Sequence, residues 1–226
     1  MTDTGADPRQ RDATVRVVGV SVSYGRVAAL QSVDLTAEQG RLLAVTGPSG
    51  AGKSTLLWVI AGAVRAGPGQ VSVGGASIDG RDRAVREGVG LIPQGNGLAT
   101  VLTARENIAI PLLSLGIRAG EAHRMTEEAL TEVDLDESGD HLVEELSGGQ
   151  QQRVAVARGL ALRSRVLLAD EPTSELDHVN RERVLALLRE QADQGAVVIM
   201  ATHDPQAAAV ADAEVRLDEG RLTTIR

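Results

Sequence analysis

Residues 47–54 read Gly47-Pro48-Ser49-Gly50-Ala51-Gly52-Lys53-Ser54 and match the pattern G-x-x-x-x-G-K-[ST] in full. The stretch follows a short apolar run and opens a helix-like run, which is the setting that the pattern requires. The glycines let main-chain N–H groups converge on a phosphate, and the helix start adds a favourable dipole. We expect Lys53 to contact the β- and γ-phosphates of a nucleotide and the Ser54 hydroxyl to bind Mg²⁺. The alternative is a glycine-rich turn without a ligand.

Apolar runs alternate with helical patterns on both sides of this loop. Strand patterns lie at 15–22, 33–35, 41–46, 90–93, 166–170 and 196–202, and an exposed hairpin is expected at 70–79. Helical patterns lie at 53–61, 103–115, 119–133, 149–162 and 179–191. Such alternation predicts an α/β fold whose mainly parallel sheet is covered on both faces.

One domain with internal lobes is expected from a chain of 226 residues. We expect residues 1–13 to be a disordered lead and residues 14–226 to form the domain. The helical stretch from about 96 to 160 interrupts the strand–helix alternation and predicts an inserted α-helical lobe. The fold class is therefore a P-loop NTPase with a mainly parallel sheet core, an antiparallel β lobe and this helical insertion.

Composition excludes several classes of function. The formal net charge of −8 argues against a protein that wraps nucleic acid, because phosphates require a basic surface. Without cysteine, disulfides, thiol catalysis and cysteine-ligated metal are excluded. The longest apolar run, 56–64, is far shorter than the roughly 20 residues that span a bilayer. Any membrane-spanning part must belong to another polypeptide.

Two carboxylates end the apolar strand pattern 166–170. Neighbouring buried carboxylates are unfavourable unless a cation or a reaction uses them. We expect Asp170 to hold Mg²⁺ and Glu171 to polarise the attacking water. Taken alone the pattern is weak, since strands often end in acidic loop residues, but the phosphate loop strengthens it.

A second helix start resembles a phosphate site. Residues 146–150, Leu-Ser-Gly-Gly-Gln, offer the Ser147 hydroxyl, two glycine amides and a helix dipole. One chain cannot easily place both helix starts on one nucleotide, whereas a symmetric dimer can place each phosphate loop opposite its partner's Ser147. The alternative is an ordinary serine N-cap.

The order of these motifs resembles the ATP-binding cassette (ABC) family over nearly the whole chain from about Val15. The phosphate loop is followed by Gln94 in the Q-loop position, the Ser147 signature, the acidic strand end, a D-loop at 174–177 and His203. The resemblance implies an ATPase that uses ATP and Mg²⁺ and dimerises around two ATP molecules. It also implies an integral membrane permease partner and a place at the cytoplasmic face of the membrane.

The resemblance assigns a role to each matching residue. Tyr24 occupies the place of an adenine-stacking aromatic, with a packed core residue as the alternative. Gln94 resembles a sensor of γ-phosphate and Mg²⁺, or else is an exposed loop glutamine. His203 resembles a switch histidine that contacts the γ-phosphate, or else is structural. The ATP-binding set is Tyr24, Gly47, Pro48, Ser49, Gly50, Ala51, Gly52, Lys53, Ser54, Thr55, Ser147, Gly148, Gly149 and Gln150. The catalytic set is Lys53, Gln94, Glu171 and His203, and the metal set is Ser54, Gln94 and Asp170.

Two positions depart from the family pattern. Glu175 replaces a small residue in the D-loop, and Pro93 precedes Gln94 where an aromatic is common, which predicts a stiffer loop. Residues 102–113 look like the corresponding segment of the lipoprotein-release and macrolide-export subfamily. A soluble ABC ATPase, such as one of cluster assembly, and a regulatory ABC ATPase of cell division are the alternatives.

Overall fold

The computed structural model describes residues 12–226. Residues 1–11 of the expected lead lie outside the described residues. The last two residues of that lead contact the domain: Ala13 is fully buried and its N–H donates to Gln39 Oε1 at 3.3 Å, while the Asp12 carbonyl accepts a bond from Arg165. Ala13, the residue just before the expected boundary, therefore packs in the same apolar core as the domain.

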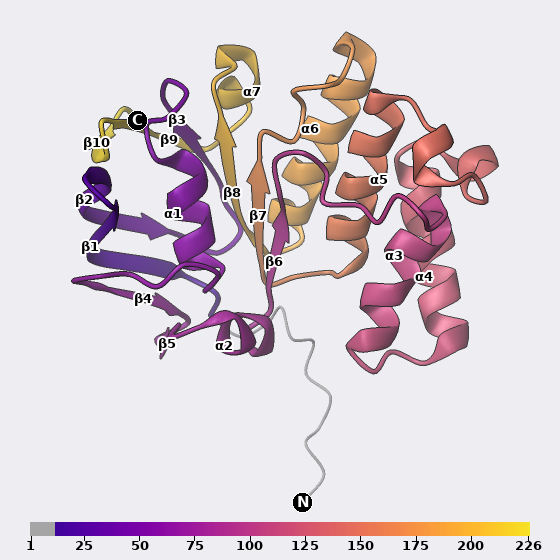
Figure 1. The fold of residues 1–226 in the computed structure, drawn as a ribbon, viewed down its shortest axis with the longest axis horizontal. Coiled ribbons are helices and arrows are strands. Elements are labelled where there is room, and N and C mark those ends of the chain that lie inside the picture. Colours follow the sequence, from indigo (N-terminus) through magenta and orange to yellow (C-terminus); the bar gives the residue numbers. More distant parts are fainter. Residues whose placement is uncertain (1–11) are drawn as a thin grey trace, which may run out of the picture.

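The strands and helices alternate along most of the chain (Figure 1). The strands are β1 (Val15–Tyr24), β2 (Val27–Ala37), β3 (Leu42–Thr46), β4 (Gln70–Val73), β5 (Ala76–Ser77), β6 (Val89–Ile92), β7 (Val166–Asp170), β8 (Val197–Thr202), β9 (Ala213–Asp218) and β10 (Arg221–Thr224). The helices are α1 (Lys53–Ile60), α2 (Arg81–Arg86), α3 (Ala104–Ser114), α4 (Ala119–Glu132), α5 (Gly148–Ala161), α6 (His178–Asp193) and α7 (Pro205–Ala209), with 3₁₀ turns η2 (Asp136–Ser138) and η3 (Val143–Glu145).

Two sheets carry the fold. The six-stranded sheet has the order β10-β9-β3-β8-β7-β6 and is parallel except at β10. The four-stranded sheet has the order β2-β1-β4-β5 and is antiparallel throughout. Both the mainly parallel core and the antiparallel β lobe are confirmed.

The buried strands of the central sheet divide the core by alternation. In β3, Leu42 and Ala44 face one apolar cluster, and Leu43 and Val45 face the other. β7 and β8 follow the same rule, because successive side chains of a strand point to opposite faces. One cluster packs against α3 to α7, and the other against α1, α2 and the antiparallel sheet.

Helices α3, α4 and α5 pack on one another at one end of the molecule (Figure 1). Their buried side chains, among them Ile108 and Leu130, belong to the same cluster as the sheet residues Leu42 and Met200. The helical region is thus joined to the sheet by a continuous core. Within residues 12–226, no helix has the length and apolarity needed to cross a membrane.

Several elements were not expected from the sequence. Helices α2 and α7 are short, and the strands β9 and β10 extend the central sheet beyond β3. The hairpin at 70–79 was expected to be exposed, which is wrong for β4, because Val71 and Val73 are buried between β1 and α1. Ser72 lies between them and two glycines follow, and this pattern produced the exposed appearance.

Candidate functional site

The carboxyl ends of four parallel strands lie side by side and bring the predicted residues together. Thr46 of β3 pairs with Thr202 of β8, and Asp170 of β7 pairs with Ala201. At the next position, Ile92 of β6 pairs with Ala169. The loops that follow these strands therefore begin side by side, at the edge where open α/β sheets bind ligands (Figure 1).

The phosphate loop between β3 and α1 depends on glycine at two close approaches. Gly47 has φ 144°, and a Cβ there would lie 2.0 Å from the Leu217 carbonyl oxygen. Gly52 has φ 106°, and its Cβ would lie 2.3 Å from the Ala29 carbonyl oxygen. Within the described chain no side chain caps α1 at Gly52. The N–H groups of its first turn thus remain available to an anion.

Lys53, the single lysine of the chain, points back into this loop. Its Nζ donates to the Gly47 carbonyl at 2.9 Å and to the Pro48 carbonyl at 3.3 Å. The same ammonium lies 3.5 Å from Glu171 Oε1, and both side chains are buried. The cation that the sequence assigns to phosphate is therefore paired with the expected general base.

Asp170 is the most unfavourably placed carboxyl of the site. It is completely buried, and neither carboxylate oxygen has a hydrogen-bond partner among the described residues. Burial raises the pKa of Asp170, an effect opposed by the nearby Ser54 hydroxyl and reinforced by Glu171. Two buried acceptors without donors, beside a hydroxyl, fit a Mg²⁺ ion.

The rest of the Mg²⁺ shell has to come from elsewhere. No group of three or more His, Asp and Glu side chains within residues 12–226 is arranged to hold a metal unaided. Mg²⁺ commonly takes only one or two carboxylates and completes its shell with waters and substrate phosphates. Asp170 and Ser54 therefore fit the ion best when it accompanies a nucleotide.

Glu171 is held in a strained backbone conformation. Its φ is 50°, in the left-handed region that non-glycine residues seldom adopt, and its N–H donates to the Ala201 carbonyl. Its Oε2 lies 3.0 Å from His203 Nδ1 and accepts a long 3.4 Å bond from the His203 N–H. His203 itself is largely exposed. The two carboxylate oxygens are thus divided between Lys53 and His203.

A cavity of about 340 Å³ brings nine of the eighteen predicted site residues together. Its lining comprises Tyr24, Val27, Ala29, Ser49, Gly50, Gly52, Lys53, Ser54, Thr55, Trp58, Gln94 and Glu171. A neighbouring cavity of about 360 Å³ is lined by Glu171, Ser174 and His203 among others, so Glu171 faces both. Gly47, Pro48 and Ala51 belong to the phosphate loop but line neither cavity.

Trp58 is a lining residue that sequence reasoning did not single out. It lies four residues after Ser54 on α1, hence on the same face of the helix. The chain has one Trp, one Tyr and no Phe, and both aromatic side chains line this cavity while partly exposed. The sequence did carry a signal, because the one Trp of the chain lies one helical turn after Ser54.

The residues at 147–150 do not reach either cavity. The Ser147 hydroxyl accepts from the Gln150 N–H at 3.3 Å, and the Gln150 side chain accepts from the Ser147 N–H at 2.9 Å. This reciprocal pair is a capping box. Within one chain, Ser147 is therefore an N-cap, and Gly148 and Gly149 lie in the first turn of α5 beside Glu175.

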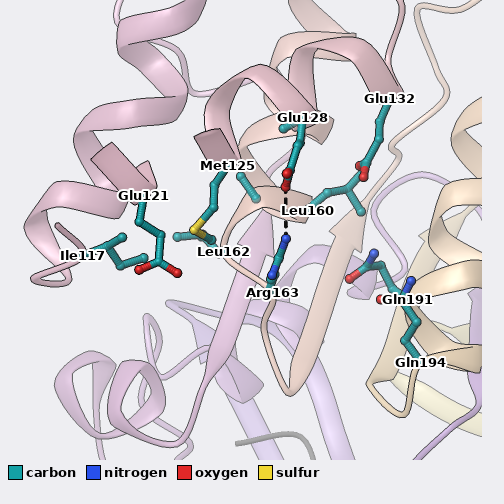
Figure 2. Close-up of a pocket in the computed structure, with 12 residues that line it drawn as sticks. Ile117, Glu121, Met125, Glu128, Glu132, Leu160, Leu162, Arg163, Gln191 and Gln194 are labelled. Carbon is teal, nitrogen blue, oxygen red and sulfur yellow. Dashed lines mark hydrogen bonds and ion pairs between the residues drawn. The ribbon is translucent and has the colours of Figure 1, made fainter. Parts of the chain in front are cut away.

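A larger cavity lies away from these residues. It measures about 670 Å³ and lies between α4, the end of α5 and α6, with Arg163 paired to Glu128 at 3.2 Å (Figure 2). Its lining includes Met125, Leu160 and Gln191 but none of the predicted site residues. We place the site by its chemistry and not by its volume, because the 340 Å³ cavity joins the phosphate loop to the buried Glu171 carboxylate and the 670 Å³ cavity does not.

Comparison with known proteins agrees with this geometry. The profile of the family described as ABC transporter matches residues 30–174. The lipoprotein-releasing system ATP-binding protein LolD of Ruegeria sp. (strain TM1040) is 38% identical over 222 residues, which cover 93% of this chain and 98% of LolD. The macrolide export ATP-binding/permease protein MacB of Marinobacter nauticus is 37% identical over 217 residues, covering 92% of this chain and 34% of MacB.

A solved structure is also similar over almost the whole chain. The dimeric post-hydrolysis state of the ATP-binding cassette MJ0796, bound to ADP and Pi, aligns with a TM-score of 0.86 at 30% identity. The alignment covers 94% of this chain and 99% of that one. Several other relatives are longer, and the chain spans between 34% and 60% of their length.

Proposed function

The chain belongs to the ABC transporter family, and we propose that it is the subunit that hydrolyses ATP to drive a separate membrane protein. The observation that carries this proposal is the 340 Å³ cavity, which unites the phosphate loop, Lys53 and the base candidate Glu171 beside the buried Asp170. The larger cavity between α4 and α6 is lined by none of these groups. The similarity to an ATP-binding cassette bound to ADP and Pi supports the same substrate.

The cavity suggests how the nucleotide is placed. The free N–H groups at the start of α1 bind the β-phosphate, and Thr55 and Ser49 line the path of the triphosphate. Tyr24 is almost half exposed at the end of β1 and offers a ring face to the adenine. Ser54, Asp170 and Gln94 would hold a Mg²⁺ ion that accompanies the nucleotide, and such an ion would supply positive charge to the phosphates.

Glu171 accepts the proton of the attacking water. As the γ-phosphate enters, Lys53 exchanges its 3.5 Å contact with Glu171 for phosphate oxygens, which frees one carboxylate oxygen. His203 holds the other oxygen at 3.0 Å and so orients the carboxylate. The water oxygen bonds to the γ-phosphorus, the bond to the β–γ bridging oxygen breaks, and ADP and phosphate are released.

A second copy of the chain completes the site. Ser147 and the amides that follow it lie outside the cavity of their own chain, so they serve the nucleotide of a partner. Similarity to dimeric cassette structures supports this arrangement. Two ATP molecules then join two chains, and hydrolysis weakens the closed state.

The names of the relatives support the proposed partner and its location. LolD and MacB are named for lipoprotein release and macrolide export, which favours an export-type system with an integral membrane permease subunit. Residues 14–226 are then the nucleotide-binding domain, with a helical lobe at about 96–160, acting at the cytoplasmic face of the membrane. No nucleic-acid role is proposed for this acidic chain.

The first test is the steady-state ATPase activity of the purified chain and of Glu171→Gln. We expect kcat to fall by about a hundred- to a thousandfold, because the variant cannot accept the proton, while the dissociation constant for ATP changes little. Glu137→Gln, at an exposed acid in η2, is the matched control and should keep the wild-type rate. Wild-type turnover by Glu171→Gln would exclude the base assignment.

The second test uses Glu171→Gln to identify the partner. With ATP, the variant should accumulate as a dimer in sedimentation velocity and should retain its partners during purification from mildly solubilised native membranes. Recovery of an integral membrane protein with an external domain supports the export-type proposal. Recovery of soluble proteins alone, with the dimer verified, would favour a soluble ABC ATPase instead.

A further inference from the structure

Arg158 of α5 reaches across to the loop that carries Gln94. Its Nη1 donates to the Gly97 carbonyl at 2.7 Å and its Nη2 to the Asn96 carbonyl at 2.8 Å. Burial lowers the pKa of this guanidinium, and no ion pair of Arg158 occurs among residues 12–226. A partly buried cation that meets only main-chain carbonyls is unfavourable. The role of Arg158 is therefore not that of a solvated surface charge.

The loop held by Arg158 has an unusual backbone. Gly95, Asn96 and Gly97 all have positive φ, at 74°, 65° and 57°. Three successive left-handed residues are disfavoured for L-amino acids, and here the central one is not glycine. The Asn96 side-chain oxygen is also buried without a partner within the described chain. The local sequence therefore permits this shape without enforcing it, and the two bonds from Arg158 help to hold it.

A second contact fixes α5 against the same strand. A Cβ at Gly159 would lie 2.4 Å from Ile92 Cγ1, so the backbone of α5 packs directly on the end of β6. Ile92 is two residues before Gln94, and Gly159 is adjacent to Arg158. Helix α5 is thus joined to this region at two adjacent positions. Gly159 packs on Ile92 at the end of β6, and Arg158 bonds to the loop that follows β6.

The same helix begins at the signature residues. Ser147 is the N-cap of α5, and the eleven residues from there to Arg158 correspond to about 16 Å along the helix axis. A helix of this length moves as a rigid rod. Its first turn presents Ser147, and its last turns hold the Gln94 loop.

We propose that Arg158 is a positioning residue that links Gln94 to the Ser147 end of α5. The proposal rests on the proposed function, since it assumes that Gln94 contacts the γ-phosphate side of the nucleotide. When Gln94 moves toward its ligand, the Asn96 and Gly97 carbonyls carry the shift through Arg158 to α5. Ser147 is then aligned for the partner's nucleotide only when the Gln94 loop is correctly placed.

A double-mutant cycle on kcat tests the link, using Arg158→Met, Gln94→Ala and the double variant. The methionine keeps much of the side-chain packing but donates no hydrogen bonds. We expect Arg158→Met to lower kcat by about ten- to a hundredfold, because small displacements of positioned groups are costly. The dissociation constant for ATP should change by less than about twofold, since the phosphate loop is untouched. The double variant should be no slower than Gln94→Ala alone, because both changes disable one unit.

Arg153→Met is the matched control. Arg153 lies on the same helix, is also partly buried with a lowered pKa, and donates from Nη1 to the Val133 and Asp134 carbonyls at 2.7 and 3.0 Å. It therefore resembles Arg158 in its partial burial and its main-chain partners, but it holds a different loop and also lies 4.0 Å from the Asp134 carboxylate. Its effect on kcat, whatever the size, should combine additively with that of Gln94→Ala.

The outcomes distinguish a failure of the proposed function from a failure of the Arg158 link alone. If the wild-type chain hydrolyses no ATP, the proposed function fails. If it does, but Arg158→Met retains kcat within about twofold or combines additively with Gln94→Ala, the link is wrong while the function stands. Should Arg158→Met not fold, Arg158→Lys serves in its place, because an ammonium can reach one of the two carbonyls. It should show a smaller loss with the same non-additivity.

Discussion

The molecule contains two glycine-rich helix starts that differ in how their polar groups are satisfied. At α1, no side chain within the described chain caps Gly52, Lys53 folds back onto its own loop, and Asp170 nearby lies buried without a donor. At α5, Ser147 and Gln150 cap each other. The start of α1 therefore has no side-chain cap and lies near a carboxylate that has no hydrogen-bond donor within the described chain. The start of α5 is instead capped by its own side chains.

The difference indicates which site one chain can form alone. Unmet donors and acceptors gathered in one cavity favour a ligand that supplies what is missing. A capped helix start gains less from a ligand, because part of its hydrogen-bonding capacity is already used. We therefore expect changes near α1 to affect nucleotide binding directly. Changes at Ser147 should affect stability and the reaction of the dimer.

The largest effect on nucleotide binding is expected from Lys53→Met at the α1 side. The variant keeps the length of the side chain but removes the cation that should contact the phosphates. We expect kcat/KM to fall by about a hundred- to a thousandfold. Equilibrium dialysis with ATP and steady-state ATPase assays check this result. Unchanged ATP affinity would contradict the assignment of the phosphate site.

The next effect separates capping from catalysis at α5. Ser147→Ala and Thr103→Ala each remove the hydroxyl of a capping box, on α5 and α3 respectively. Each should lower the free energy of unfolding by about 1 kcal/mol, measured by urea titration. Only Ser147→Ala should also reduce ATPase activity, by about tenfold, because its hydroxyl serves the partner's nucleotide. Equal ATPase rates in the two variants would leave Ser147 as a cap alone.

A third substitution, also near α1, should raise the stability of the chain instead of lowering it. Burial disfavours the ionised form of Asp170, so Asp170→Asn should stabilise the chain without nucleotide by about 1–2 kcal/mol at neutral pH. The same substitution should abolish Mg²⁺-dependent hydrolysis. Thermal unfolding without nucleotide gives the stability, and a lower midpoint than wild type would show that Asp170 is not strained by its burial.

The smallest effect concerns a third helix start, at α6. Asp177 caps α6, and the bonds that its carboxylate accepts from Asn180 hold the pKa of Asp177 below its ordinary value of 3.8. The stabilising contribution of the ionised group is therefore present above pH 3.8 and lost as the pH falls through the lowered pKa. Asp177→Asn keeps a good cap that does not titrate.

Urea unfolding of wild type and Asp177→Asn between pH 7 and pH 3 checks this. The stability advantage of the wild type should shrink at the acid end. A difference that stays constant with pH would mean that the carboxylate charge contributes nothing to the cap.

The sequence by itself determined the parts of this protein that depend on local pattern. The loop 47–54 predicts its own conformation, because Gly47 and Gly52 lie where no side chain fits and Lys53 follows at the helix start. The alternation of short buried strands with helices predicts the parallel core, since crossovers place helices on both faces. The start of α5 is likewise readable from Ser147 and Gln150, which lie three residues apart.

Other features depended on residues that are distant in sequence. The strands β9 and β10 are short and partly polar, and they are stabilised by pairing with β3 and with each other. The contact of Lys53 with Glu171 and that of Arg158 with the Gln94 loop join residues more than sixty positions apart. No local pattern encodes such pairs. They form because the register of β3, β6, β7 and β8 brings four separate loops to one edge, where their polar groups must find partners.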